Sequence, residues 1–200
     1  MSDIHDIQDL FEEPEDATPL TPDEQRGLIP SDIAYRRELN RAEQENIARA
    51  ENWALGRRRN WLTEKLIKDL HRRMLGDVWR WAGHFRTSER NLGIPFYQIP
   101  MALLELLNDV NAWIEHPSYP PNEIAVRFHH RLVHIHPFPN GNGRHSRLMA
   151  DLLIIQLGGE RFTWGSANLI DAGEVRRRYI ASLQAADQHD LAPLVAFARS

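Results

Sequence analysis

Apolar side chains recur at helical spacing over almost the whole chain after residue 30, and this periodicity constrains the fold more than any other feature. In residues 63–79, for instance, Leu66, Leu70 and Met74 form one stripe of a helix. The same spacing predicts helices over about 31–55, 63–79, 100–115, 121–135, 144–157, 171–187 and 191–199. The period is lost at 83–99, where two glycines, alternating aromatics and a proline predict a short hairpin or extended flap. The fold class we expect is therefore all-α, a helical bundle with a short β-hairpin flap.

Charge divides the chain into an acidic leader and a mildly basic remainder. Residues 1–25 hold nine acidic residues and no Lys or Arg, so residues 26–200 carry a net charge of +5. A leader of this composition is typical of a disordered, solvated tail. We therefore expect a tail (1–25), an N-terminal helical segment (26–58) and a core domain (59–200). A charge of +5 suits a phosphate-bearing ligand but is too small to indicate nucleic-acid binding.

Several residue types and segments are absent from the sequence. The chain has no cysteine, which excludes a disulfide framework and a thiolate metal site. Its first residues lack the basic and apolar regions of a signal peptide, and no run approaches the roughly 18 apolar residues of a membrane span. The expected localisation is cytoplasmic, without a membrane partner.

One polar segment, HPFPNGNGRHSR at residues 136–147, separates two apolar helices and is the candidate functional site. The helix that follows it begins with unpaired N–H groups and the positive end of the helix dipole. Gly141 and Gly143 remove the Cβ atoms that would keep a phosphate away from the backbone. Arg144 and Arg147 leave the same helix face and suit several phosphate oxygens. His136, at the far lip of the loop, could take a proton from an attacking hydroxyl.

Other interpretations of these residues stay open. Gly-Asn-Gly is a common turn sequence, and arginines on a helix face are often only solvated. His130 and His134 are four residues apart, as in zinc proteases, but no Glu follows the first and no third ligand is evident. A module that binds nucleotide through this loop without catalysis is a further alternative.

The segment at 136–147 resembles the signature of the Fic-domain family (filamentation induced by cAMP), in which a His-x-Phe start, a Gly-Asn-Gly turn and two arginines follow in this spacing. The flanking FHHRLVHIHPF, the stretch WRWAGHFRT at 79–87 and DLAPLVAF near the end resemble the same family. The resemblance covers roughly 60–199 and implies the Fic fold. Residues 28–59 resemble the subgroup called mobile mystery protein B.

This resemblance implies an enzyme, a protein adenylyltransferase that transfers AMP from ATP to a Ser, Thr or Tyr hydroxyl of a target protein. His136 would be the general base, and Phe138 would anchor the loop. Mg²⁺ would accompany ATP as the substrate. The implied nucleotide-binding residues are Asn140, Gly141, Asn142, Gly143, Arg144 and Arg147. The implied target-binding residues on the flap are Arg86, Thr87 and Ser88.

One position departs from the family pattern. Asn140 stands where the family has an acid that ligates Mg²⁺, and a neutral amide oxygen is a weaker ligand for that ion. The ATP phosphates could carry the metal with weak help from Asn140, or the enzyme could be slow. Transfer could also be lost, or another phosphate-containing group could be transferred. The retained His136 argues against loss.

Regulation by the N-terminal segment is a further implication. Fic enzymes resemble one another in an inhibitory helix, whose Ser/Thr-x-x-x-Glu-(Gly/Asn) motif sends its glutamate to the last arginine of the signature. Residues 26–58 contain two Glu-Asn pairs, at 45–46 and 51–52, but neither has a hydroxyl residue four positions earlier. The inhibitory candidates are therefore Glu45 and Glu51, with Glu51 preferred because it lies nearer the core. A separate inhibitory partner protein is the alternative, and a homodimer stays open.

Overall fold

The computed structural model describes residues 26–56, 60–166 and 172–200, so the acidic tail predicted at 1–25 lies outside the described residues. The described helices are α2 (Arg36–Leu55), α3 (Glu64–Leu75), α4 (Ile99–Glu115), α5 (Pro121–Ile135), α6 (Asn142–Gln156), α7 (Ala172–Asp187) and α8 (Ala192–Ala198), with a short 3-10 helix, η2 (Phe96–Gln98), before α4. The all-α prediction is confirmed. Within the described ranges, no helix is both long and apolar enough to cross a membrane.

The β-hairpin expected at 83–99 is not found. This segment is a loop of bends that leads into η2, and an isolated antiparallel bridge between Leu28 and Trp79 lies outside it. Arg86 accounts for the difference, because its guanidinium donates to the carbonyls of Ser88 and Ile94. Each of these carbonyls thus has a side-chain donor in place of the N–H of a second strand. We call residues 86–95 the flap.

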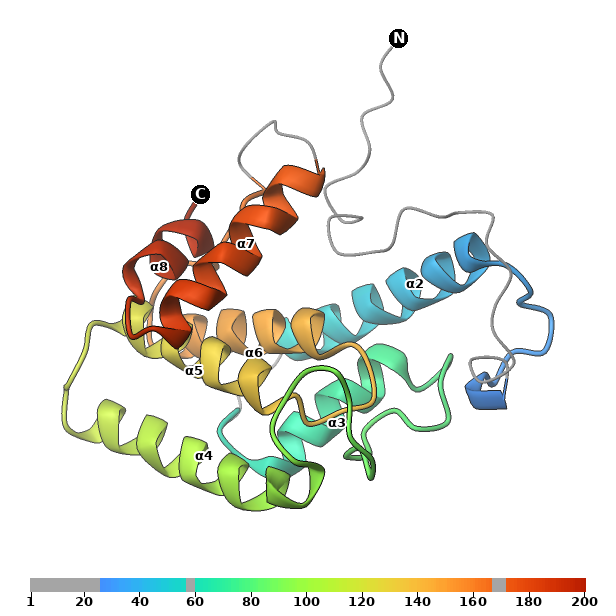
Figure 1. Ribbon diagram of the computed structural model, residues 1–200, viewed down its shortest axis with the longest axis horizontal. Helices are drawn as coiled ribbons and strands as arrows, with labels where there is room; N and C mark the ends of the chain where they lie inside the picture. The colour runs from blue at the N-terminus through green and yellow to red at the C-terminus, as the bar shows by residue number, and fades with distance from the viewer. Residues whose placement is uncertain (1–25, 57–59, 167–171) are drawn as a thin grey trace, which may run out of the picture.

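Helix α6 lies at the centre of the fold, beside α5, as Figure 1 shows. Residues 145–154 are buried without interruption, as expected for a helix covered on most sides. Helices α2 and α3 cover one side of this pair, α7 and α8 cover the other, and α4 runs along α5 (Figure 1). The loop that joins α5 to α6 therefore projects from the best-buried part of the molecule.

Helix α3 begins as the sequence predicts, because the Thr63 hydroxyl accepts a hydrogen bond from the Leu66 N–H at 3.2 Å. Helix α2 packs on α3 through a buried stripe that includes polar side chains. Within it, Asn46 donates to the Arg73 carbonyl at 2.7 Å and accepts from the Asp77 N–H at 3.0 Å. These two bonds tie α2 to the C-terminal end of α3 and fix its position.

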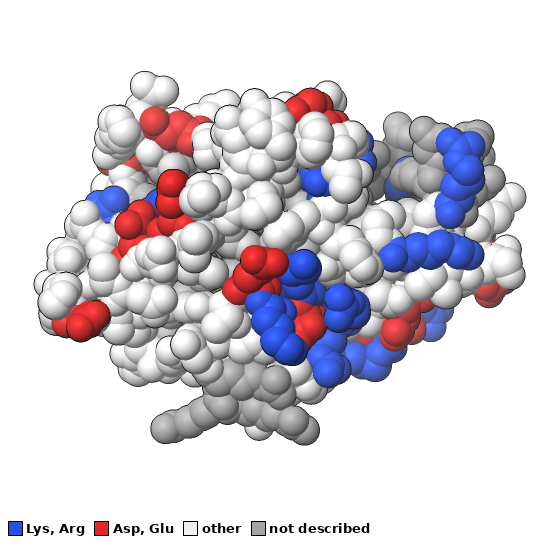
Figure 2. All heavy atoms as spheres, turned by 90° about the horizontal axis from the view of Figure 1, so that it is seen from below, with Lys and Arg blue, Asp and Glu red and all other residues white. Residues whose placement is uncertain are grey.

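Charged side chains on the face seen from the side of α4 are mixed in sign (Figure 2). Lys and Arg stand beside Asp and Glu near the middle of this face. The exposed surface of α3 has the same character, with Lys65 bonded to Asp69 at 2.5 Å and Lys68 to Glu64 at 3.4 Å. Pairs of this kind stabilise a helix by a few tenths of a kcal/mol, roughly 0.3–0.5 each.

Candidate active site

The loop between α5 and α6 is held by its own polar side chains. The Asn142 side chain accepts from the Phe138 N–H at 2.9 Å and donates to the Phe138 carbonyl at 2.8 Å. Phe138 is fully buried and stacks on His71 of α3, with ring centroids 3.6 Å apart. The predicted anchoring role of Phe138 therefore has a structural basis. The amide of Asn142 closes the loop, which leaves the backbone at this residue as the part that could meet a ligand.

A second contact from α3 supports the same loop. The His71 Nε2 lies 3.0 Å from the Asn140 carbonyl, while its Nδ1 accepts from the Gly83 N–H at 2.9 Å. This pattern requires the neutral tautomer with the proton on Nε2. Burial is the main cause that holds the pKa of His71 well below its usual value, so the neutral form persists at physiological pH. The sequence argument did not single out His71, because it lies 69 residues from its partner.

The two signature glycines have different functions. Gly141 precedes the first residue of α6 with φ +76°, and a Cβ there would meet Leu75 Cδ1 at 2.6 Å. Protein packing therefore requires this glycine. Gly143 lies in the first turn of α6, and a Cβ there would have no neighbour within 4 Å. The space in front of Gly143 is open, as expected for a backbone that receives a ligand at a helix N-terminus.

His136 ends α5 in the left-handed region, with φ 52°. Its Nδ1 lies 3.3 Å from the Val133 carbonyl, an acceptor, so Nδ1 carries the proton and Nε2 keeps its lone pair. Burial is the main cause that lowers the pKa of His136, the Val133 carbonyl raises it, and the charge of Arg86 lowers it further. A neutral imidazole with a free Nε2 is the form that a general base requires.

Both signature arginines face the same cavity, but their surroundings differ. Arg147 is buried, its guanidinium lies 5.6 Å from the ring centroid of Tyr179 on α7, and burial lowers its pKa to about 10. Arg144 forms an ion pair at 2.7 Å with Glu43 of α2, whose other oxygen accepts from the Trp79 indole N–H at 2.5 Å. Glu43 is only 5% exposed. A buried carboxylate from α2 is thus bonded to a signature arginine.

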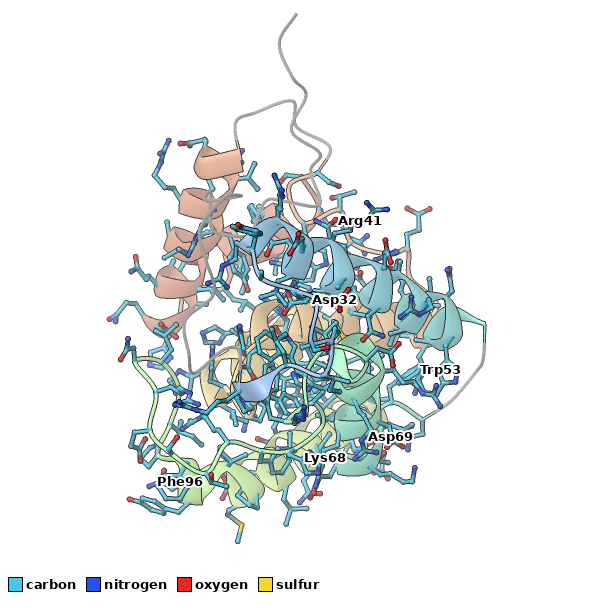
Figure 3. The ribbon with its side chains drawn as sticks, turned by 90° about the vertical axis from the view of Figure 1, so that its right-hand side faces the viewer. Asp32, Arg41, Trp53, Lys68, Asp69 and Phe96 are labelled. Atoms are coloured by element: carbon cyan, nitrogen blue, oxygen red, sulfur yellow. The ribbon has the colours of Figure 1, made fainter. Side chains whose placement is uncertain are left out.

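The two glutamates predicted as inhibitory lie elsewhere. Glu45 pairs with Arg41 on the outer surface of α2, where Figure 3 labels Arg41. Glu51 pairs with Arg161, which also bonds Asp151 of α6 at 2.7 Å. The α2 carboxylate that meets the signature is that of Glu43, and it bonds the first signature arginine, Arg144, whereas the predicted contact joined Glu45 or Glu51 to the last one, Arg147.

One cavity of about 610 Å³ brings the site together. Its lining includes His136, Arg147 and the continuous run from Asn140 to Arg144. Helix α7 supplies a second part of the wall, which the sequence argument did not identify, through Arg176, Tyr179, Ile180, Leu183, Gln184 and Asp187. Helix α5 adds His130, Val133 and His134, and the flap adds Leu92 and Gly93.

Other predicted site residues take different positions. Thr87 and Ser88 are exposed, but Arg86 is buried, and this corrects the expectation that Arg86 contacts a target protein directly. His130 Nε2 lies 2.8 Å from Asp187, and His134 Nδ1 lies 4.0 Å from it. In the parts of the chain that the structure describes, no group of three or more His, Cys, Asp or Glu side chains could hold a metal ion.

The fold and the loop define a helical domain in which a histidine, a glycine turn and two arginines surround one cavity. Residues 61–154 match the model of the Fic/DOC family, so this part of the chain is a Fic/DOC family domain. Among curated proteins, the chain is similar to the protein adenylyltransferase Fic of Aedes aegypti, with 34% identity over 140 residues. The match covers 68% of this chain and 27% of that protein, so the chain spans about a quarter of the relative's length.

Solved structures agree with the family match. Fic-1 from Caenorhabditis elegans superposes with a TM-score of 0.61 at 27% identity, and the match covers 79% of this chain and 48% of that chain. The N-terminal Fic domain of a VirB-translocated effector protein from Bartonella quintana, solved with bound ADP, gives a TM-score of 0.64 at 21% identity. That match covers 84% of this chain and 86% of the other, and it supports the fold.

Proposed function

We propose that this protein is a protein adenylyltransferase, which transfers AMP from ATP to a Ser, Thr or Tyr hydroxyl of a target protein. One observation carries the proposal: His136, the N-terminus of α6 and both signature arginines face a single cavity of about 610 Å³. A cavity of this size suits a nucleotide. The adenylyltransferase activity in the names of the curated relatives supports the same reaction.

The proposed reaction follows from the geometry. The target hydroxyl oxygen forms a bond to the α-phosphorus of ATP while His136 Nε2 accepts the hydroxyl proton. The bond between the α-phosphorus and the oxygen that bridges to the β-phosphorus breaks, and pyrophosphate leaves. The phosphates enter the open space at Gly143, where the first N–H groups of α6 and the two signature arginines bind them. Transfers of this kind are catalysed mainly by positioning and by charge stabilisation.

The residues near the loop fit a protein-held Mg²⁺ poorly. The amide oxygen of Asn140 is neutral and already accepts from the Gly141 N–H at 2.7 Å. In the described ranges, no cluster of acids or histidines accompanies it. Mg²⁺ that arrives with ATP would therefore depend on phosphate and water oxygens.

The proposal extends to the surroundings of the site. Thr87 and Ser88, both exposed on the flap, would contact the target segment. The proposal also includes the mobile mystery protein B subgroup for residues 28–59, a cytoplasmic location, and regulation by α2 or by a partner protein. Glu43 is the residue of α2 to test for regulation, because it bonds the signature residue Arg144.

Two labelled forms of ATP test the reaction. Incubation of the full chain with ATP labelled at the α-phosphate, and with lysate whose own kinases have been inactivated, should label protein, whereas ATP labelled at the γ-phosphate should not. The α-label should disappear in His136→Ala and persist in His116→Ala, a matched control at an exposed histidine after α4. Transfer of the γ-label would instead identify a phosphate transferase.

The alternative is a module that binds nucleotide without transfer, and the neutral Asn140 is the observation that favours it. Calorimetric titration with ATP separates the two functions. Nucleotide binding without protein labelling, under conditions in which Asn140→Asp does label, would assign the loss of activity to this single position.

A further inference from the structure

The Arg86 side chain donates four hydrogen bonds beside the site, although it lies outside the signature. It is 3% exposed, and its backbone N–H donates to the Pro137 carbonyl at 2.9 Å. Its Nε donates to the His136 carbonyl at 2.7 Å, and its terminal nitrogens donate to the carbonyls of Ser88 at 3.2 Å and Ile135 at 3.4 Å, and to that of Ile94. One guanidinium thus joins both ends of the flap to the last turn of α5.

These acceptors suit an arginine and no other side chain. The carbonyls at the end of α5 carry the negative end of the helix dipole, which favours a cation there. A planar guanidinium presents five N–H groups in fixed directions, whereas a lysine ammonium is a compact centre with three donors. Lysine could therefore keep the charge at this position but could not reach all four carbonyls.

Gly93 brings the flap against the same point. Its φ is +97°, and a Cβ at this residue would lie 2.5 Å from His136 Cβ and 2.8 Å from an Arg86 terminal nitrogen. The flap therefore lies directly on the histidine, with no room for another side chain between them. Figure 1 shows the flap crossing in front of the α5–α6 loop.

We propose that Arg86 is a positioning residue for the transfer reaction, which holds the flap and His136 in one arrangement so that target docking and base alignment depend on each other. The inference rests on the proposed function. Because the flap carbonyls and the His136 carbonyl share one guanidinium, a flap that moves away also releases the residue that carries the base. The phosphate cradle at Gly143 and Arg147 lies on α6, whereas the Arg86 guanidinium bonds carbonyls of the flap and of the end of α5, so ATP binding should be independent of this clamp.

The test compares Arg86→Lys, Arg86→Gln and Gly93→Ala with Arg90→Gln in the full chain. Arg90 is exposed on the same flap and donates to the Ser88 hydroxyl at 3.3 Å. Arg90→Gln is therefore the control for the loss of a positive charge from the flap. We expect both Arg86 variants to bind ATP as the unsubstituted protein does, while kcat for α-label transfer falls by roughly 100-fold, the cost of about 1 Å of misplacement, and we expect a similar fall in kcat for Gly93→Ala. Arg90→Gln should retain kcat within about twofold.

Two measurements need no transferase activity. Hydrogen exchange should speed up by about tenfold or more for the amides of residues 87–94 in Arg86→Gln, and the ring signals of His136 in NMR spectra should shift. If exchange and the His136 signals both stay unchanged, or if kcat is unchanged, the clamp is refuted. Equal losses of ATP affinity and kcat would also refute it, because they indicate general damage. Absence of transfer by the unsubstituted protein would refute the proposed function, and the exchange and NMR results would still decide the clamp.

Discussion

Replacement of Glu43 by glutamine tests whether α2 restrains the site. Glu43 bonds Arg144 at 2.7 Å and the Trp79 indole at 2.5 Å, and it is only 5% exposed. Glutamine keeps the shape and can still accept from Trp79, so the substitution removes the charge and little else. The Arg144 guanidinium would then be available to an ATP phosphate without competition from a carboxylate.

The size of the effect follows from the charges. Two unit charges about 4 Å apart attract by about 4 kcal/mol at an effective dielectric constant of 20. ATP recovers only part of this energy, since the Arg144 side chain is 21% exposed and solvent screens it in either state. A net gain of about 1.4–2.8 kcal/mol corresponds to about 10- to 100-fold tighter ATP binding. Transfer of the α-label should rise in the same direction.

Isothermal titration with ATP measures this change, and Glu45→Gln and Glu51→Gln are the matched controls on the same helix. Both bond arginines outside the signature, Arg41 and Arg161, so neither should change ATP affinity by more than about twofold. Weaker ATP binding in Glu43→Gln would refute the reasoning, because it would mean that Glu43 orients Arg144 for the nucleotide. A gain in all three variants would assign the effect to net charge.

Three further predictions concern Asn140, the two signature glycines and two buried histidines. Asn140→Asp should raise Mg²⁺-dependent transfer by roughly tenfold or more, because a carboxylate can ligate the ion and still accept from the Gly141 N–H, and activity independent of this change would contradict the ligand argument. Gly143→Ala should weaken ATP binding, because a methyl group would fill the open space, yet it should stabilise the fold by about 0.5–1 kcal/mol, because alanine favours a helix. Gly141→Ala should destabilise the fold by about 1–3 kcal/mol, because alanine is strained at a positive φ. Calorimetry measures the ATP affinity, and urea unfolding measures the stability of both variants. Burial lowers the pKa of His129 to about 3 and that of His145 to about 4. The unfolded chain therefore binds more protons below the ordinary histidine pKa of 6.5, so the free energy of unfolding should fall below that pH, by about 1.4 kcal/mol per pH unit for each histidine. Equal unfolding free energies at pH 7 and 5 would contradict this.

Periodicity and the signature predicted much of the fold because both are local signals. Helices α3 and α5 follow from apolar spacing, and the Thr63 cap follows from residue type. The glycine turn at the start of α6 follows from the requirement for a positive φ at Gly141. The hairpin prediction was wrong because alternating aromatics indicate only an extended chain and do not show what its backbone bonds to. Here the Arg86 side chain, and not a second strand, bonds the flap carbonyl of Ile94 and the carbonyl of His136.

Glu43 illustrates a signal that was present and not used. Its position shares the helical stripe of Leu39, Asn46 and Ala50, all of which are buried on α2. Spacing alone therefore places a carboxylate on the buried face, where a charge needs a partner. The Glu-Asn pairs of the family motif occur instead at Glu45 and Glu51, which bond arginines outside the signature. Which arginine Glu43 meets could not be predicted, because Arg144 lies about a hundred residues away in the sequence.

The contacts around the signature loop explain why it can serve as a preorganised site. Asn142 closes the loop on itself, His71 of α3 bonds the Asn140 carbonyl, and Arg86 of the flap bonds the His136 carbonyl. Each contact comes from a different element, so the loop cannot relax at one end without losing a bond at another. A cradle fixed in this way need not reorganise when charge develops on the transferred phosphate. The flexibility that a glycine-rich sequence suggests is therefore removed by packing, and the loop is held in one arrangement before a ligand arrives.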